Sequence, residues 1–165
     1  QGPVLIRFPK GTVTTATDLG VEAAKPPEGL RARQLRDGSD VCILAVGDRV
    51  RAAQVAADLL AEQRIAASVW DVRSVRPADP VMLEAAAAAP LVVTVENGVV
   101  GGGAGAELAD RLVERAGLLT SPPILRLGVP ATYLRHAKPD VILAELGLDA
   151  PGIAAAASKA LEAHR

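Results

Sequence analysis

The sequence is poor in cysteine, histidine and aromatic residues, and each shortage excludes a class of protein. A single cysteine in 165 residues allows no disulfide within the chain and no site with several cysteine ligands. His136 and His164 lie far apart without acidic neighbours, so we expect no metal site. Aromatic residues make up 2% of the chain, so its core must be built from Val, Leu, Ile and Ala.

An excess of one charge and long apolar runs are also missing. The formal net charge is -1, which is too far from basic to attract a nucleic-acid backbone. No apolar run approaches the roughly 18 residues of a membrane-spanning helix, and no charged start leads into a signal-peptide core. We therefore expect a cytoplasmic protein with neither a nucleic-acid partner nor a membrane partner.

Half of the residues are hydrophobic, and from Arg31 onward they alternate between short apolar runs and stretches of helical periodicity. This alternation predicts an α/β fold with three α/β/α layers around a mostly parallel sheet of about five strands. Asp37-Gly38 is typical of a hairpin turn, which would add one antiparallel strand. Strands are expected at 33–35, 41–46, 67–72, 91–95 and 123–127, and helices at 49–63, 79–88, 104–116, 139–146 and 152–163.

The first part of the chain has a different character. Residues 2–8 form an apolar run that predicts a strand, and the following stretch up to residue 30 is polar, small and Pro-containing, as linkers are. The chain begins with Gln1 instead of Met. We therefore expect residues 1–11 to be the tail of a preceding domain, residues 12–30 to be a linker, and residues 31–165 to form the main domain.

A glycine-rich stretch follows one of the predicted strands and opens a helix. Gly101, Gly103 and Ala106 match the loose G-x-G-x-x-G/A pattern of dinucleotide-binding turns, in which backbone N–H groups face an anion. That pattern also needs an acidic residue about 20 positions on, and the next strand ends in Arg126-Leu127-Gly128. We therefore favour a tight structural turn, and an anion site or a contact surface remains the alternative.

Three acidic residues lie at the ends of buried strands, at the edge where the sites of open α/β sheets gather. Glu96 has the position of an acid or base, but no histidine or second acid accompanies it, so we favour a role in capping the glycine-rich loop. Asp48 is expected to N-cap the following helix. Asp71 and Arg73 are expected to form an ion pair or to anchor a loop.

Two cationic residues are candidates for a functional contact. Arg7 ends the first apolar run, where a guanidinium could grip a phosphate, although a surface ion pair fits the chemistry equally well. His136 lies in a loop after a strand and is the better placed of the two histidines. No serine has the G-x-S-x-G setting of a nucleophile. The residues alone assign no catalytic group.

Four segments occur in a single order: RFPKG at 7–11, DVCILAVGDR at 40–49, ENGVVGGGAG at 96–105, and the stretch from Arg126 that leads to LAELGL at 143–148. Together they resemble the C-terminal part of the 1-deoxy-D-xylulose-5-phosphate synthases, which are thiamin diphosphate enzymes of the transketolase superfamily. The family usually has Arg-Tyr-Pro-Arg-Gly where this chain has RFPKG. It tends to have Phe-Ile-Glu-His-Gly where this chain has Tyr133 to Ala137, so His136 is retained and its neighbours are not.

The resemblance implies the fold of the transketolase C-terminal domain and a contact of Arg7 with the substrate phosphate. The full enzyme uses thiamin diphosphate and Mg²⁺ to condense pyruvate with D-glyceraldehyde 3-phosphate, with loss of CO₂. The family's Gly-Asp-Gly…Asn cofactor motif does not occur in this chain. The resemblance thus implies a chain that binds no cofactor alone, is inactive alone, and works with other domains in a homodimer.

Two further interpretations remain open at this point. One is a stand-alone binding or assembly domain that uses its glycine-rich loop, and the other is a piece of a 2-oxoacid dehydrogenase β subunit. The RFPKG segment does not suit a free-standing domain, and LAELGLDA does not suit the dehydrogenase. We therefore favour the synthase.

Overall fold

The computed structural model describes residues 2–6 and 30–164, and the second range folds around a five-stranded sheet. The strands are β1 (Arg33–Arg36), β2 (Val41–Ala45), β3 (Ala67–Asp71), β4 (Val92–Val99) and β5 (Ile124–Val129). They lie in the order β1-β3-β2-β4-β5, with β2 to β5 parallel and β1 antiparallel. The predicted fold class, a mostly parallel sheet with one antiparallel strand, is confirmed.

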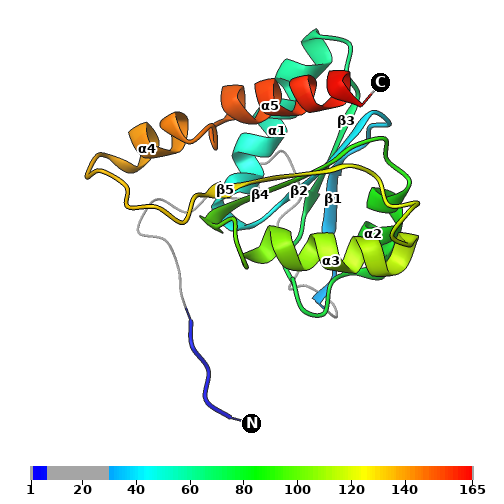
Figure 1. Ribbon diagram of the computed structural model, residues 1–165, viewed down its shortest axis with the longest axis horizontal. Helices are drawn as coiled ribbons and strands as arrows, with labels where there is room; N and C mark the ends of the chain where they lie inside the picture. The colour runs from blue at the N-terminus through cyan, green and yellow to red at the C-terminus, as the bar shows by residue number, and fades with distance from the viewer. Residues whose placement is uncertain (1, 7–29, 165) are drawn as a thin grey trace.

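Within residues 30–164 the chain also forms five α-helices (Figure 1). They are α1 (Val50–Glu62), α2 (Pro80–Ala87), α3 (Ala104–Ala116), α4 (Pro139–Glu145) and α5 (Ala150–Ala163). Helices α1 and α5 pack against each other on one face of the sheet, α2 and α3 pack on the other, and α4 lies beside the sheet. As expected, Asp79 caps α2 by accepting a hydrogen bond from the N–H of Val81, and Gly117 ends α3 with φ of 88°.

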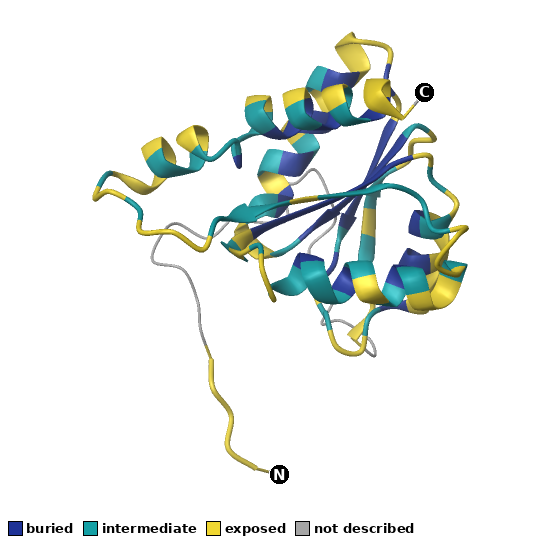
Figure 2. Ribbon diagram, viewed as in Figure 1, coloured by how far each residue is buried: buried dark blue, intermediate teal, exposed yellow. Residues whose placement is uncertain are grey.

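The middle strand β2 shows why the sheet needs helices on both faces. All five of its residues are buried (Figure 2). Val41, Ile43 and Ala45 join the core beneath α1 and α5, whereas Cys42 and Leu44 join the core beneath α2 and α3. Burial raises the pKa of the Cys42 thiol to about 11, so this cysteine is a neutral packing group.

The first strand pairs differently from the expectation. Asp37-Gly38 predicted a hairpin between β1 and β2, but β1 instead pairs with β3, with Gln34 opposite Trp70. The connection passes directly over the start of β3, where a Cβ on Gly38 would lie 2.2 Å from the carbonyl carbon of Ala67. Only glycine permits this approach. The chain therefore crosses the start of β3 on its way from β1 to β2, and the hairpin that the turn residues predicted does not form.

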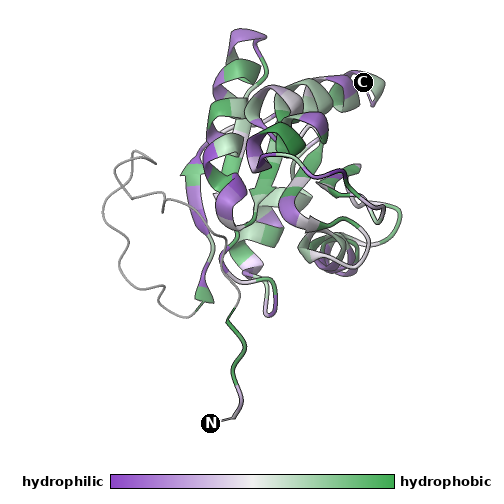
Figure 3. Cartoon of the chain, turned by 90° about the vertical axis from the view of Figure 1, so that its left-hand side faces the viewer, coloured by the Kyte–Doolittle hydropathy of each residue, from purple (hydrophilic) through white to green (hydrophobic). Residues whose placement is uncertain are grey.

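Residues 2–6 contain no strand, so the predicted strand at 2–8 is wrong for these residues. Val4, Leu5 and Ile6 are exposed, and their apolar character is visible in Figure 3. A strand needs a neighbour to receive its hydrogen bonds, and none of the described residues provides one. The rest of that segment, including Arg7 and most of the expected linker, lies outside the described residues.

The stretch Pro139–Ala163 is long and apolar enough to cross a membrane by length and composition alone. In the fold it is divided at Gly147, with φ of +67°, into the separate helices α4 and α5. Helix α5 buries Ile153, Ala157 and Leu161 in the core beneath α1. We interpret this stretch as part of the globular fold.

Candidate functional site

The order of the strands creates a topological switch point at their C-terminal ends. The chain leaves β2 toward β3 on one side and later returns to β4 on the other side of β2. In open α/β sheets, ligands bind at such a switch point. In this protein it is formed by Asp48 and Arg49, which follow β2, and by Glu96 and Asn97 of β4.

Glu96 is buried at this point, with 6% of its surface exposed, and lies within β4 instead of at its tip. Its Oε2 accepts a hydrogen bond from the N–H of Ala104 at 3.0 Å, and its Oε1 accepts one from the N–H of Gly105 at 2.7 Å. These two residues begin α3. The carboxylate therefore caps the positive end of the helix and satisfies two of the N–H groups that a helix start leaves free.

The glycines of the neighbouring loop make room for this carboxylate. A Cβ on Gly98 would lie 2.6 Å from Oε2 of Glu96, and a Cβ on Gly103 would lie 2.5 Å from the same atom. Gly128 of β5 also lies against this side chain, since a Cβ on Gly128 would be 3.3 Å from Cγ of Glu96. By contrast, a Cβ on Gly101 would meet nothing within 4 Å. Gly103 is thus required by an internal contact, and Gly101 is not.

This geometry determines what the glycine-rich loop can bind. The N-terminus of α3 would suit a phosphate, but the protein's own carboxylate already holds its first two N–H groups. A second anion would find these donors taken and would be repelled by Glu96. The arrangement excludes a dinucleotide phosphate at this helix end. It agrees with the interpretation of Glu96 as a cap.

Thr94, which lies two residues before Glu96, was not singled out by any pattern in the sequence. Its Oγ1 is buried and has no hydrogen-bond partner among the described residues. A Cβ on Gly105 would lie 2.4 Å from this oxygen, so the hydroxyl lies directly beneath the start of α3. A threonine in a strand is ordinary, so only the packing of α3 onto β4 shows this residue to be part of the site.

Asp48 does not cap α1, and that prediction is wrong. Residues Gly47–Arg49 form a 3₁₀ turn, so α1 begins one residue after Arg49, without a side-chain cap. Asp48 instead accepts hydrogen bonds from Asn97 Nδ2 at 2.9 Å and from Arg49 Nη2 at 3.2 Å. Arg49 also donates to the carbonyl of Leu148 at 3.0 Å. The polar groups at the switch point thus connect the end of β2, the strand β4 and the α4–α5 corner.

The other predicted site residues that the structure describes are not brought to this switch point. His136 is exposed in the loop between β5 and α4, and no hydrogen bond or ion pair joins it to Glu96 in the described part of the chain. Its neighbour Arg135 pairs with Glu145, which raises the pKa of Arg135 and lowers that of Glu145. The position of Arg7 lies outside the described residues. The roles of Arg7 and His136 therefore stay predictions.

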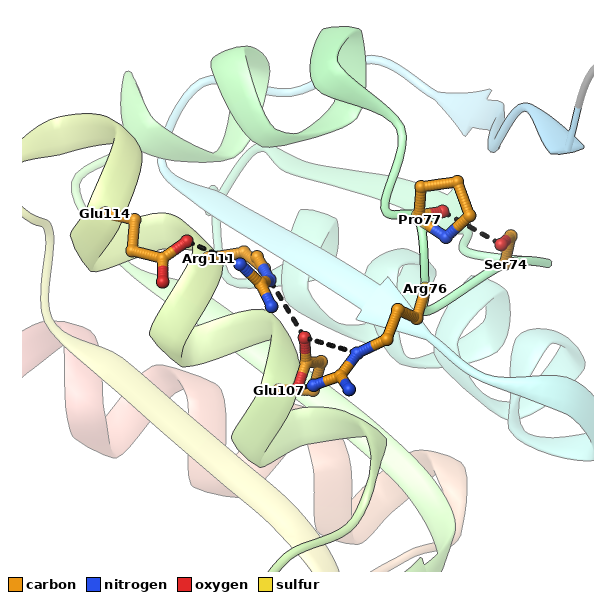
Figure 4. A network of polar contacts seen from close by, with 6 residues as sticks. All are labelled: Ser74, Arg76, Pro77, Glu107, Arg111 and Glu114. Carbon is orange, nitrogen blue, oxygen red and sulfur yellow. Dashed lines mark hydrogen bonds and ion pairs between the residues drawn. The ribbon is translucent and has the colours of Figure 1, made fainter.

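A separate polar network lies on the α2 and α3 face (Figure 4). Arg76, in the loop after β3, donates to Glu107 of α3 with Nε at 3.1 Å from Oε1. Arg111 contacts the same Oε1 at 2.8 Å and also reaches Glu114 at 2.7 Å. Hydrogen bonds from Arg76, and then from Arg111, lower the pKa of Glu107. Nearby, Arg73 and Asp71 form the expected ion pair at 3.1 Å.

The network predicts a pH-dependent stability. The pKa of Glu107 is lower in the folded chain than its ordinary value of 4.5. The ionised Glu107 therefore stabilises the fold above pH 4.5, and this stabilisation is lost as the pH falls below 4.5 toward the lowered pKa. We expect Glu107→Gln to lower the free energy of unfolding near neutral pH, by an amount that shrinks in acid and in 1 M salt. Urea unfolding between about pH 3 and 7 measures this. Glu162→Gln on α5 is the control, and a difference that grows in acid would contradict the assignment.

A diphosphate cofactor with its metal ion needs a cluster of metal ligands and free N–H groups that face the phosphates. No three His, Cys, Asp or Glu side chains within residues 2–6 and 30–164 gather to ligate a metal. The helix start that would suit a diphosphate is capped by Glu96. A diphosphate with Mg²⁺ therefore does not fit this part of the chain.

Known protein families and sequences resemble this chain along most of its length. The model of the transketolase C-terminal domain matches residues 30–153. The 1-deoxy-D-xylulose-5-phosphate synthase of Synechococcus sp. (strain JA-2-3B'a(2-13)) is 41% identical over 155 residues, which are 93% of this chain and 23% of the relative. That of Pseudomonas savastanoi pv. phaseolicola is 41% identical over 162 residues, which are 97% of this chain and 24% of the relative. The chain thus spans about a quarter of the length of these relatives.

Two solved structures have a similar fold. A split gene transketolase, described as an inactive β4 tetramer, superposes with a TM-score of 0.74 at 34% identity over 84% of this chain and 44% of that chain. A transketolase mutant from Pichia stipitis, in complex with xylulose 5-phosphate, superposes with a TM-score of 0.54 at 19% identity over 81% of this chain and 18% of that chain. The second likeness concerns the fold alone.

Proposed function

We propose that this chain, which belongs to the transketolase C-terminal domain family, is the C-terminal module of a 1-deoxy-D-xylulose-5-phosphate synthase. The observation that carries the proposal is an identity of about 40% to such synthases along nearly the whole chain, for example 41% over 97% of it. The complete enzyme would act in the cytoplasm. It would join pyruvate and D-glyceraldehyde 3-phosphate with loss of CO₂, toward isoprenoid, thiamin and pyridoxal precursors.

Within that enzyme, the role of this chain is architectural. The polar groups at its switch point bind each other: Glu96 holds the start of α3, and Asp48 holds Arg49 and Asn97. None of them is left to act as an acid or a base. Thiamin diphosphate and Mg²⁺ would be held by other domains, and the isolated chain would be inactive.

The proposal also assigns roles to the first 30 residues and names the partners of the chain. Residues 1–11 would end a preceding pyrimidine-binding domain, residues 12–30 would link it to the C-terminal domain, and Arg7 would contact the substrate phosphate. The partners would be the other domains of the enzyme and a second subunit. The solved structure described as an inactive β4 tetramer supports this, because it is an assembly of several subunits that is described as inactive.

A chimera tests the proposal. Residues 1–165 would replace the matching segment of the Synechococcus synthase, which is 41% identical to this chain. We expect the chimera to form product from pyruvate and D-glyceraldehyde 3-phosphate, because the replaced module supplies structure and one phosphate contact. The same synthase without the segment, and residues 1–165 alone, should be inactive. A folded but inactive chimera, or turnover by the isolated chain, would contradict the proposal.

The chimera also tests Arg7. We expect Arg7→Ala to raise KM for D-glyceraldehyde 3-phosphate by roughly 10- to 100-fold, since a charge-assisted contact is worth about 1.5–3 kcal/mol. KM for pyruvate, which has no phosphate, should stay the same. Lys10→Ala, three residues further on, is the matched removal of a positive charge. Equal effects of Arg7→Ala on both substrates would remove Arg7 from the phosphate site.

A further inference from the structure

The segment that connects β5 to α5 has few contacts with the core. Residues 131–148, which we call the strap, contain the helix α4 and a single buried residue, Leu148. Helix α4 itself has no buried residue, whereas each of the other four helices has at least three. Figure 2 shows this difference, since α4 lacks the dark blue that marks buried residues in α1 and α5. Most of the strap therefore lies against solvent.

The polar contacts of the strap are almost all internal. An ion pair joins Arg135 to Glu145, and the backbone hydrogen bonds of α4 run within the helix and its two ends. In the part of the chain that the structure describes, one hydrogen bond reaches the strap from outside residues 130–148, and its donor is Arg49. The strap can therefore move without breaking a network that belongs to the rest of the fold.

Both ends of the strap adjoin firmly held structure. Before it, Val129 of β5 pairs with Val99 of β4, and its carbonyl accepts a hydrogen bond from the N–H of Val100 at 2.9 Å. After it, Asp149 caps α5 by accepting a hydrogen bond from the N–H of Gly152 at 2.9 Å. A segment with few buried groups between two firm elements is the kind that opens locally while the rest of a protein stays folded.

Two contacts fasten the strap, and both are made by Leu148. Its side chain is fully buried in the core beneath α1 and α5. Its carbonyl accepts a hydrogen bond from Nη1 of Arg49 at 3.0 Å. The side chains of Leu143 and Leu146 pack against the same core but stay partly exposed. Leu148 is thus the point at which the strap is held.

Arg49 is itself held at the switch point. Its Nε and Nη2 lie 3.3 and 3.2 Å from the carboxylate of Asp48, which also binds Asn97 of β4. Only 12% of the Arg49 side chain is exposed. A guanidinium fixed in this way is preorganised to hold the carbonyl of Leu148, and a hydrogen bond from a charged donor is stronger than a neutral one. This contact therefore joins the strap to the switch point.

We propose that the strap opens and closes as one unit while the sheet and the other four helices stay folded, and that Arg49 is the latch that holds it closed. Opening withdraws Leu148 from the core and breaks its hydrogen bond with Arg49. It also moves Tyr133 and His136, which are exposed on the strap, relative to the switch point. Local openings of this kind take microseconds to seconds. The inference goes beyond the proposed function, since it concerns the motion of this chain and not the activity of an enzyme.

Hydrogen exchange of the full chain, followed by NMR, tests the opening. The reporters are the hydrogen-bonded amides of Leu146 and Leu148. We expect both to exchange through an opening that low urea hardly accelerates, because a small opening exposes little new surface. The amide of Cys42, in the middle strand, should exchange more slowly and only through global unfolding, which urea promotes. A common rate and a common urea dependence of the three amides would overturn the proposal.

The Arg49→Met variant tests the latch, because it removes the guanidinium and keeps the apolar stem. We expect exchange at Leu146 and Leu148 to rise roughly 10- to 100-fold, the effect of losing a charge-assisted hydrogen bond. Arg115→Met is the matched control. It breaks a pair with Glu84 on the opposite face of the sheet, so the amides of the strap should keep their rates. Unchanged exchange of the strap in Arg49→Met, or an equal rise in Arg115→Met, would contradict the assignment of Arg49 as the latch.

Discussion

Glu96→Ala is expected to lower the free energy of unfolding by roughly 2–4 kcal/mol. The change removes two hydrogen bonds to a carboxylate and leaves the N–H groups of Ala104 and Gly105 without their buried partner. For a domain of this size the loss corresponds to a fall in Tm of roughly 5–15 °C. Thermal and urea unfolding, followed by circular dichroism, measure it. Glu96→Gln, which keeps one accepting oxygen, should have a stability between those of Glu96→Ala and the wild type.

The same variant tests whether a free anion can take the place of the Glu96 carboxylate at the start of α3. Without Glu96, the start of α3 becomes an open anion position, so acetate should raise the Tm of Glu96→Ala more than that of the wild type. Chloride at the same ionic strength is the control. An Ala variant as stable as the wild type would show that the carboxylate does not hold the helix. Equal responses of the two proteins to acetate would show that the vacated position accepts no anion.

Gly103→Ala is expected to lower stability by roughly 1–3 kcal/mol, while Gly101→Ala in the same loop should change little. A Cβ on Gly103 would lie 2.3 Å from the carbonyl oxygen of Val99, and backbone cannot move aside as a flexible side chain can. A Cβ on Gly101 would meet nothing within 4 Å. Unfolding of the two variants in urea gives the comparison. Equal losses would contradict the close packing at Gly103.

The local structure of this chain could be predicted from its sequence because the signals are short-range. Continuous runs such as Val41–Ala45 predicted strands buried on both faces, and β2 lies at the centre of the sheet. The helix ends at Asp79 and Gly117 follow from a capping side chain and from the left-handed conformation that glycine accepts. Even the cap at Glu96 was the favoured interpretation, because no second titratable residue stood beside it.

Long-range contacts decided the features that the sequence misplaced. Asp37-Gly38 is a good hairpin turn, but Gly38 lies against Ala67, so β1 joins β3 instead of β2. Asp48 is a good N-cap residue, but Asn97 from β4 engages its carboxylate. A local pattern gives the preference of a few residues, and a contact across the fold can outweigh it.

The sequence by itself therefore determined the α/β class, the positions of the elements and the family, because these depend on periodicity, turn residues and characteristic segments. Only the tertiary structure decided that the glycine-rich loop encloses the protein's own carboxylate. Oε1 and Oε2 of Glu96 reach the start of α3 because β4 and α3 pack together, bringing residues eight and nine positions apart into contact. The same packing places Gly103 in close contact and leaves Gly101 open, a difference that the repeated glycines of the sequence do not reveal.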